Sequence, residues 1–297
     1  MDLRQLEYLV AVVDEGGFTR AAERVHISQS GVSAQVRRLE RELGLPLLDR
    51  SGRVVTATAA GEAVLPFARS ALAAVAGARA AVDELAGLLR GQVTVGMVTG
   101  CTMPDFTAAL ADFHRAHPEV GVSLVERSSS ELVQAARSGR LDLVVAGVHG
   151  PPSEGLQRLV LVDEQLVLAV PPGSVLAGRA EVDIEELADE TLVGLPPGAG
   201  VRAAFDAGCA GHPVRIALEA SSPAVVADLA AQGLGIAVLS ASMVAGHPGL
   251  RAVPLAGPWP TARLEVLWRD DGTASPAARA LAAVMRARLQ PARRAVA

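Results

Sequence analysis

The sequence predicts a multi-domain α/β protein in which an N-terminal winged helix-turn-helix is joined by a long helix to a two-lobed α/β domain. Three observations support this prediction. Apolar residues at helical spacing precede a short turn and strand in residues 18–56, Leu and Val recur in a seven-residue rhythm over residues 59–90, and strand and helix patterns alternate from residue 91 onward. Half of the 297 residues are apolar, which is enough to fill a core in each of two or three domains.

The first helix is expected over residues 2–15, and Gly16-Gly17 ends it. Its apolar residues fall on one face: Leu3, Leu6, Leu9, Val10 and Val13. Because one face is apolar, this helix is expected to pack against the helices that follow and to support them.

A short helix over residues 19–26 and a longer one ending at Gly44 are expected next. Ser28 is a good N-cap for the longer helix, and Ile27 can pack as its hydrophobic staple. The core-facing stripe consists of Val32, Val36, Leu39 and Leu43, and the opposite face carries Gln29, Ser30, Ser33, Arg37 and Arg38. Small polar side chains in the first turn suit contact with base edges in a major groove. A three-helix bundle with a solvated basic face has the same spacing.

A wing is expected after this helix, with a turn over residues 49–53 and a short strand over residues 54–56. Its arginines could reach phosphate or the minor groove. Between residues 19 and 58 there are seven arginines against four acidic residues, a local charge of +3 in a chain of net charge −5. Phosphate contact requires such a local excess and not a basic whole protein.

A long helix is expected over residues 59–90, where an apolar seam recurs at Leu65, Leu72, Val75, Val82, Leu85 and Leu89. A long helix with one apolar seam requires a partner helix, or packs on its own chain. Pro66 and Gly77 weaken the helical pattern, because an interior proline costs about 3 kcal/mol, so a kink or a start near Pro66 is expected.

Strands and helices alternate in the remaining chain. The first unit has strands at 93–98, 120–125 and 141–146 with helices at 103–117 and 131–138. The second has strands at 166–170, 191–195, 214–218 and 236–239, with helices at 183–187, 201–207 and 223–232. A late strand at 264–268 and a closing helix at 276–289 follow. This alternation favours a parallel sheet covered on both faces.

Composition excludes several classes of protein. All 27 basic residues are arginine, so lysine Schiff-base chemistry and a lysine-bearing phosphate loop are excluded. Cys101 and Cys209 are too few for a disulfide scaffold or a thiolate zinc site. There is no signal-peptide pattern, and charges or turn residues interrupt each apolar stretch before about 18 residues, so we expect a cytoplasmic protein without membrane association.

Over residues 3–61 the chain resembles the LysR-type transcriptional regulators. The resemblance rests on Leu3 to Leu6, Ala21-Ala22, Ser28 to Ser30, Ser33, Leu39-Glu40, Leu43-Gly44, Leu47 to Arg50, Thr56 and Gly61 in the family's order and spacing. It implies that Gln29, Ser30 and Ser33 face bases and that Arg50 and Arg53 hold the DNA backbone. The full set of expected DNA-contacting residues is Thr19, Arg20, Ser28, Gln29, Ser30, Ser33, Arg37, Arg50 and Arg53. Ala34 and Leu48 depart from the usual family residues.

The resemblance also implies a domain plan. Residues 1–58 would form the winged helix-turn-helix and residues 59–90 the dimerisation helix. Residues 91–297 would form a periplasmic-binding-protein-like effector domain, with lobe I at 91–161 plus 266–297 and lobe II at 162–265. The chain would cross between lobes at 161–166 and 261–266. Dimers paired through the long helix would assemble into homotetramers on bacterial promoter DNA and, for an activator, contact RNA polymerase.

Four loops are candidates for a ligand site, because ligands of open α/β sheets lie beyond the carboxyl ends of strands and at helix N-termini. The candidate residues are Thr99, Gly100, Cys101, Thr102, Ser129, Ser130, Gly147, Val148, Pro197, Gly198 and Arg202. Arg202 could pair with an anion across the cleft, or be a surface arginine. Thr102 could be a plain N-cap, and serine runs are common in plain loops.

Other motifs carry less chemistry. Gly233-Leu234-Gly235 lacks the third glycine of a dinucleotide fingerprint and is expected to be a tight turn after a helix. His114 and His117 are expected to be solvated and not metal ligands. Cys101 precedes a helix N-terminus, where a thiol pKa tends to fall, so redox or metal sensing is an alternative to a small buried apolar side chain.

The sequence therefore predicts a DNA-binding regulator tuned by a small anionic ligand, without enzymatic activity and without a cofactor. A constitutive or redox-responsive regulator is the alternative, and a constitutive architectural protein predicts a filled cleft between the lobes. An α/β enzyme fused to a DNA-binding head predicts a catalytic cluster, and no arrangement of that kind is evident in residues 91–297.

Overall fold

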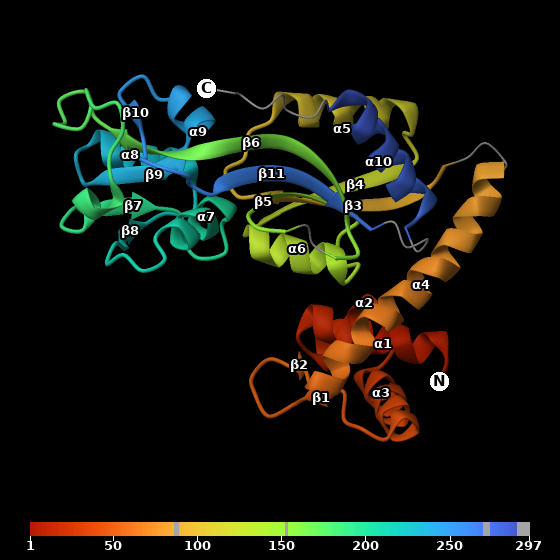
Figure 1. Ribbon diagram of the computed structural model, residues 1–297. Coiled ribbons are helices and arrows are strands. Elements are labelled where there is room, and N and C mark those ends of the chain that lie inside the picture. Colours follow the sequence, from red (N-terminus) through yellow and green to blue (C-terminus); the bar gives the residue numbers. More distant parts are fainter. Residues whose placement is uncertain (86–88, 152–153, 270–273, 290–297) are drawn as a thin grey trace.

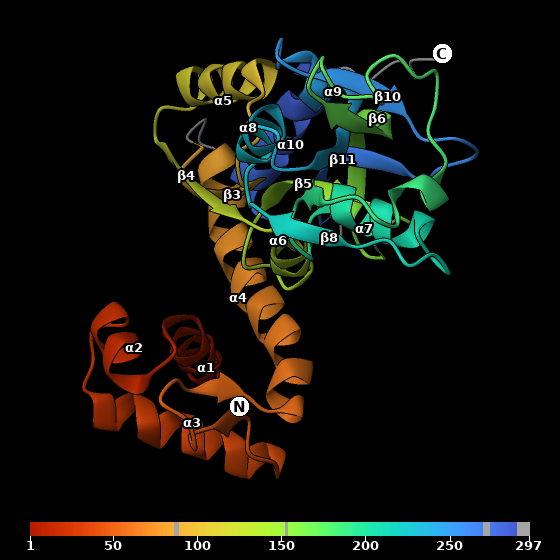
Figure 2. The ribbon, with the colours of Figure 1, turned by 90° about the vertical axis from the view of Figure 1, so that its left-hand side faces the viewer.

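The computed structural model describes residues 1–85, 89–151, 154–269 and 274–289. It has three parts (Figures 1 and 2): an N-terminal head, the long helix α4 (Ala59–Leu85), and a C-terminal domain to which α4 leads.

The head contains α1 (Leu3–Glu15), α2 (Phe18–Arg24) and α3 (Gln29–Leu43). Side chains and glycines fix the helix ends as the sequence predicts. Asp2 caps α1 in a reciprocal pair of hydrogen bonds with Gln5, and the Ser28 hydroxyl accepts the Gly31 N–H at the start of α3. Gly16 and Gly44 end α1 and α3 in the left-handed conformation that glycine adopts without strain.

The wing contains two short strands where the sequence predicted one. β1 (Leu48–Asp49) pairs with β2 (Thr56–Ala57) in an antiparallel ladder. The predicted strand at 54–56 is wrong in its first two residues, because Val55 donates its N–H to the Gly16 carbonyl and Val54 is exposed. The wing is therefore attached to the end of α1 as well as to its own hairpin.

Helix α4 starts at Ala59 and contains Pro66, so the expected start near the proline is wrong. Thr58 stabilises the start, since its hydroxyl accepts the Gly61 N–H and donates to the Pro46 carbonyl. The expected end at residue 90 is not observed, because residues 89–90 are not helical and residues 86–88 lie outside the described residues.

Some residues of the predicted α4 seam are buried in the head and others are exposed. Leu65 and Ala68 are buried in the core of the head and Leu72 packs partly against it, whereas Val75 and Val82 are exposed. The side chains of Leu85 and of residues 86–88 lie outside the described part of the chain. Residues Ala59–Ala78 form the one described segment with the length and hydropathy of a membrane span. Its mean hydropathy is 1.2, and 17% of it is buried.

The C-terminal domain is built on one sheet. Its first unit contains β3 (Gly91–Val98), α5 (Pro104–Ala116), β4 (Val120–Arg127), α6 (Ser129–Arg137) and β5 (Leu143–Val148). Then come β6 (Gln157–Val170), the 3-10 turn Ile184–Leu187, β7 (Leu192–Gly194), α7 (Gly200–Gly208), β8 (Ile216–Glu219), α8 (Pro223–Ala231), β9 (Ile236–Ser240), α9 (Ala241–Ala245), β10 (Arg251–Pro254), β11 (Thr261–Trp268) and α10 (Pro276–Arg288). In the described chain the strand order is β4-β3-β5-β11-β6-β9-β7-β8, with β10 beside β6.

The expected parallel sheet is found within each lobe, but the sheet as a whole is mixed. β3 is parallel to β4 and β5, and β7 is parallel to β8 and β9, but β6 and β11 run antiparallel to each other and to their other neighbours. β6 begins nine residues before the predicted strand at 166–170, and its first half includes the apolar run of residues 159–162. This half pairs with β11 and the second half with β9 and β10, so β6 passes from one lobe into the other.

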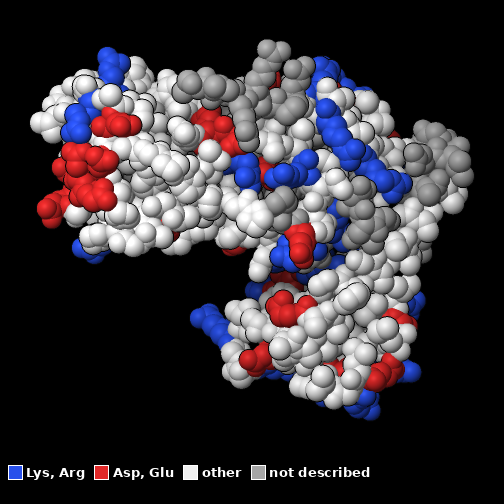
Figure 3. Space-filling model, in the orientation of Figure 1, with Lys and Arg blue, Asp and Glu red and all other residues white. Residues whose placement is uncertain are grey.

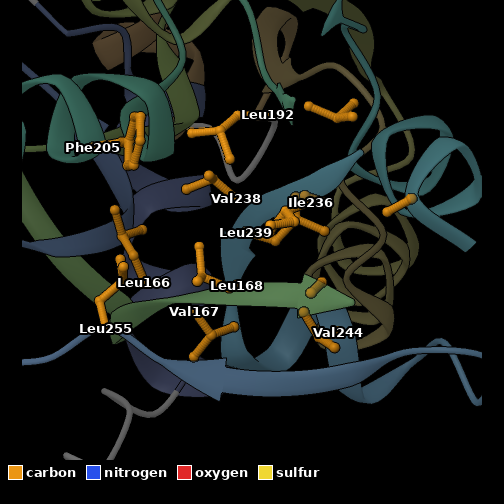
Figure 4. Close-up of a cluster of buried hydrophobic side chains, with 14 of the residues drawn as sticks. Leu166, Val167, Leu168, Leu192, Phe205, Ile236, Val238, Leu239, Val244 and Leu255 are labelled. Atoms are coloured by element: carbon orange, nitrogen blue, oxygen red, sulfur yellow. The ribbon is translucent and has the colours of Figure 1, made fainter. Parts of the chain in front are cut away.

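Each lobe has its own core. In lobe I, α5 and α10 cover one face of the sheet and α6 covers the other (Figure 1). In lobe II, side chains from β6, β7, β9 and α7 form one cluster, among them Leu168, Leu192, Phe205 and Val238 (Figure 4).

Candidate DNA-binding and ligand-binding sites

The exposed face of α3 carries much of the predicted DNA-contacting set. Gln29, Ser30 and Arg37 are exposed, while Val32 and Val36 on the other side of the helix are fully buried. Thr19 of α2 and Arg53 of the wing are exposed too. Arginines lie at the outer edge of the head around α3 and the wing, with acidic residues between them (Figure 3).

Three residues of that set differ from expectation. Ser33 is only 9% exposed, so its hydroxyl does not lie on the open face of α3. The Arg20 guanidinium donates to the Glu15 carbonyl at the end of α1. Arg50 pairs with Glu40 at 2.7 Å and lies over the Phe18 ring, 5.3 Å from its centroid. Arg20 and Arg50 are therefore engaged within the head.

A cavity of about 790 Å³ lies between the two lobes. Its wall includes loops that follow β3, β4 and β5 in lobe I, and residues of α7, β9 and α9 in lobe II. The predicted residues that line it are Thr99, Gly100, Cys101, Thr102, Ser129 and Gly147. Ser128, beside the cavity, caps α6 in the same way that Ser28 caps α3 in the head.

The other predicted ligand residues do not line this cavity: Ser130, Val148, Pro197, Gly198 and Arg202. Arg202 is held by Asp206 and Glu219 and donates to the Leu195 carbonyl. Burial alone would lower the Arg202 pKa, but the hydrogen bonds to Glu219 and Asp206 raise it above its ordinary value. The Arg202 side chain therefore bonds to other residues of lobe II and does not reach across the cleft.

The two lobes touch along one side of the cavity through glycines. The Ser130 N–H donates to the Gly198 carbonyl at 3.1 Å, which joins the start of α6 to the loop before α7. A Cβ atom added to Gly200 would lie 2.3 Å from the Gly147 carbonyl carbon. The backbones of β5 and α7 can therefore approach this closely only because Gly200 lacks a side chain, whereas a Cβ on Gly147 would make ordinary contacts at 3.4 Å.

Sequence reasoning placed Ser128 in a candidate loop but missed several other polar groups in the cavity wall: Arg127, Glu131, Ser221, Ser240, Ser242, His247 and Arg263. Ser240 could have been predicted, because it is the last residue of β9 and ligands lie beyond the carboxyl ends of strands. Arg263 required the tertiary structure, since it lies at the crossover, pairing with Glu265 at 2.8 Å and donating to the Gly150 carbonyl.

The acid–base properties of the wall follow from these contacts. Hydrogen bonds from the Ser128 hydroxyl and N–H lower the Glu131 pKa, so this carboxylate is committed to capping α6. The Arg127 guanidinium donates to the Glu126 carbonyl and contributes a positive charge at the cavity wall.

Of the two interpretations of Cys101, the structure favours the small buried side chain over the thiol with a lowered pKa. Burial, and then the nearby Glu126 charge, raise the Cys101 pKa to about 11. Desolvation here outweighs the effect of the helix N-terminus. Cys209 is buried in lobe II, where burial and Asp206 likewise raise its pKa to about 11.

His117, the C-cap residue of α5, packs against an aromatic ring of that helix. The His117 ring lies 5.1 Å from the Phe113 ring, centroid to centroid, at an angle of 53°. Within the described residues, no group of three or more His, Cys, Asp or Glu side chains is placed to hold a metal ion.

Comparison with known proteins identifies both parts of the chain. Residues 3–62 match the model of the bacterial regulatory helix-turn-helix protein, lysR family, and residues 86–290 match the LysR substrate binding domain. The HTH-type transcriptional regulator ShiR of Corynebacterium glutamicum (strain R) is 36% identical over 246 residues, which is 80% of this chain and 82% of that protein.

Two further relatives cover nearly the whole chain. The Hca operon transcriptional activator HcaR of Escherichia coli (strain K12) is 32% identical over 97% of this chain and 98% of that protein. The structure of a full-length OxyR variant from Pseudomonas aeruginosa superposes with a TM-score of 0.72 at 28% identity, covering 98% of this chain and 99% of that one. The chain therefore belongs to the LysR family of transcriptional regulators.

Proposed function

We propose that this regulator binds a small anionic ligand in the cavity between its lobes and that the ligand changes its binding to promoter DNA. The observation that carries this proposal is a cavity of about 790 Å³ lined by both lobes, within the range of small-molecule sites. Apolar side chains such as Met103, Val162 and Met243 share its wall with hydroxyls and the Arg127 guanidinium. This combination suits an apolar body with one carboxylate.

The ligand acts by differential affinity. The wall of the cavity comes from two lobes, so a ligand that contacts both lobes favours one interlobe arrangement over another. Only that difference in affinity can shift the equilibrium between the arrangements. The filled cleft that a purely architectural protein predicts does not fit a cavity of this size. The domains in this proposal are 1–58 for DNA, 59–90 for dimerisation and 91–297 for the effector, of which residues 86–88 and 290–297 lie outside the described part.

Pairing of two copies through α4 is part of the proposal. Phe67, Val75 and Val82 of this helix are 78%, 38% and 66% exposed, and their spacing of eight and seven residues places them on one face. A second copy of α4 would cover this face and bring two reading heads onto successive half-sites. Assembly into homotetramers in the cytoplasm, and contact with RNA polymerase during activation, complete the proposed function.

The redox alternative is disfavoured by the cysteines. Both thiols have pKa values raised to about 11, so neither has the thiolate character of a peroxide-reactive cysteine. Catalysis is not part of the proposal, because the relatives are transcriptional regulators.

The test is a thermal-shift screen of the full-length chain against small aliphatic and aromatic carboxylates. A ligand at 100 times its dissociation constant stabilises the folded protein by about 2.7 kcal/mol. Arg127→Gln and Thr99→Ala should remove the shift, whereas Arg115→Gln and Thr107→Ala, which lie on α5 outside the cavity, should keep it. A shift that survives both cavity variants, or no shift with any carboxylate, would contradict the proposal.

A further inference from the structure

The C-terminal end of α1 is a junction at which the other elements of the head meet. Val55 of the wing donates its N–H to the Gly16 carbonyl at 3.0 Å. From α2, Arg20 donates to the Glu15 carbonyl. These contacts place basic groups and an N–H donor on the carbonyl-rich end of α1, where positive charge is favoured. A displacement at this end of α1 would therefore be transmitted to both α2 and the wing.

The long helix reaches the same junction through one side chain. Arg69 of α4 donates to both carboxylate oxygens of Asp14, at 2.5 and 3.2 Å. The Arg69 side chain is 9% exposed and that of Asp14 is 20% exposed, and the two residues are 55 positions apart in sequence. Arg24 of α2 approaches the same carboxylate at 3.4 Å. Asp14 thus contacts both α4 and α2.

The Asp14–Arg69 pair is poorly explained as a device for stability. Burying two charges is costly, and apolar residues of similar size often stabilise a core equally well. In addition, the Arg69 Nε is buried without a hydrogen-bond partner, which adds to the cost. What the pair supplies is direction, because a two-point hydrogen bond fixes both distance and angle.

The apolar contact between α1 and α4 lacks this directional property. Leu65 and Ala68 bury their side chains in the head beside Leu9 and Val12. Apolar burial is non-directional, so it tolerates small rotations and shifts of one helix across another. The views in Figures 1 and 2 show α4 crossing the head beside α1 before it continues to the C-terminal domain. A small change in crossing angle at Arg69 is therefore enlarged over the remaining length of α4.

We propose that Asp14 and Arg69 are positioning residues that fix the direction in which α4 leaves the head, and thereby the spacing and rotation of the two half-sites that a dimer reads. This inference rests on the proposed pairing of two copies through α4. It assigns the pair a role in DNA recognition without contact with DNA.

The test uses full-length Arg69→Met, which keeps a side chain of similar length and removes the buried charge. The matched control is Arg115→Met, which removes the arginine of an exposed pair with Asp112 on α5. The probes are the duplex that the wild-type chain selects from a random library, versions with one or two base pairs inserted between its half-sites, and a duplex with one half-site. Affinities are measured by fluorescence anisotropy at fixed salt.

The expected result is a loss of discrimination between spacings. A two-base-pair insertion rotates one half-site relative to the other by about 70° at about 10.5 base pairs per turn, and should weaken wild-type and Arg115→Met binding by at least about tenfold. For Arg69→Met the same insertion should weaken binding by less than about threefold, and affinity for the single half-site should change by less than about twofold.

Two results would overturn the inference: an unchanged spacing profile in Arg69→Met, or an equal loss of affinity for every probe, which would show a merely structural role. If the head of Arg69→Met does not fold by circular dichroism, Arg69→Lys decides by the same criteria, since it keeps the charge and loses the two-point bond. If the wild-type chain itself shows no spacing preference, the proposed dimeric reading fails, and this outcome is distinct from a failure confined to Arg69.

Discussion

Substituting Gly200 with alanine should force the two lobes apart. The new Cβ would lie 2.3 Å from the Gly147 carbonyl carbon and 2.6 Å from both the Gly147 oxygen and the Val148 nitrogen. Carbon atoms in contact normally stay about 3.5–4.0 Å apart, so the backbones of α7 and β5 must separate by more than about 1 Å. No flexible side chain can give way, because all three neighbours are backbone atoms.

The cost of this clash is about 1–3 kcal/mol, which is typical of overpacking in a well-packed contact. If that cost falls on the arrangement that binds ligand, affinity should decrease by about 5- to 150-fold. Trp259 is a suitable reporter, because it packs directly on Gly208 of the same helix and stacks on Phe205. Urea unfolding followed by tryptophan fluorescence gives the stability, and titration with the carboxylate found in the thermal-shift screen gives the affinity.

Gly173→Ala is the matched control, because no atom lies within 4 Å of the position of its Cβ and its backbone is not left-handed. It should change stability by less than about 0.5 kcal/mol. Alanine is favoured over glycine in a helix by up to about 1 kcal/mol, so helix propensity opposes the effect expected at Gly200. A Gly200→Ala chain with wild-type stability and ligand affinity would show that the lobes do not meet at this contact in solution.

Three further predictions follow from the head and the cavity. Gln29→Ala should weaken binding to the preferred duplex by about 1–3 kcal/mol and leave non-specific binding unchanged, as measured by gel shift in competition with random DNA. Gly61→Ala should lower the free energy of unfolding of the head by about 1–3 kcal/mol in urea melts, because its Cβ would lie 2.1 Å from the Leu47 carbonyl oxygen. With a pKa raised to about 11, Cys101 should react with iodoacetamide about a hundredfold slower at pH 7 than a free cysteine peptide, and rapid labelling of the folded chain would restore the redox reading.

The head could be predicted in most of its detail because its signals are local. Ser28 and Gly44 mark the ends of α3 with the side-chain cap and left-handed glycine that their chemistry predicts. Ser33 shows the limit of such signals. Its spacing places it near the polar face, but only the packing of α3 shows that its hydroxyl is buried.

The sheet of the C-terminal domain was harder to predict, because strand direction is set by contacts between distant residues. The apolar run that became β5 was evident, but its antiparallel neighbour β11 comes more than a hundred residues later. The first half of β6 contains the apolar run of residues 159–162 between Gln157-Arg158 and Asp163, so a strand signal was present there and was not recognised.

The candidate ligand site could be predicted by its loops and not by its charges. The rule for strand ends located Thr99, Ser129 and Gly147, which line the cavity. Arg202 misled the prediction, because a sequence does not reveal that Asp206 and Glu219 occupy its guanidinium. Arg127 ends β4 and was open to the same rule, whereas Arg263 lies at the crossover and required the tertiary structure.

The path of β6 and β11 between the lobes restricts how the domain can deform. These strands lie side by side and exchange backbone hydrogen bonds through the region where β6 passes from lobe I into lobe II. A hydrogen-bonded ribbon of two strands resists shearing and in-plane bending, but it twists and flexes out of its plane at small cost. Relative motion of the lobes is thereby directed into twisting and out-of-plane bending of the ribbon. Many different ligands could then produce the same output, because each can move the lobes only along these two coordinates.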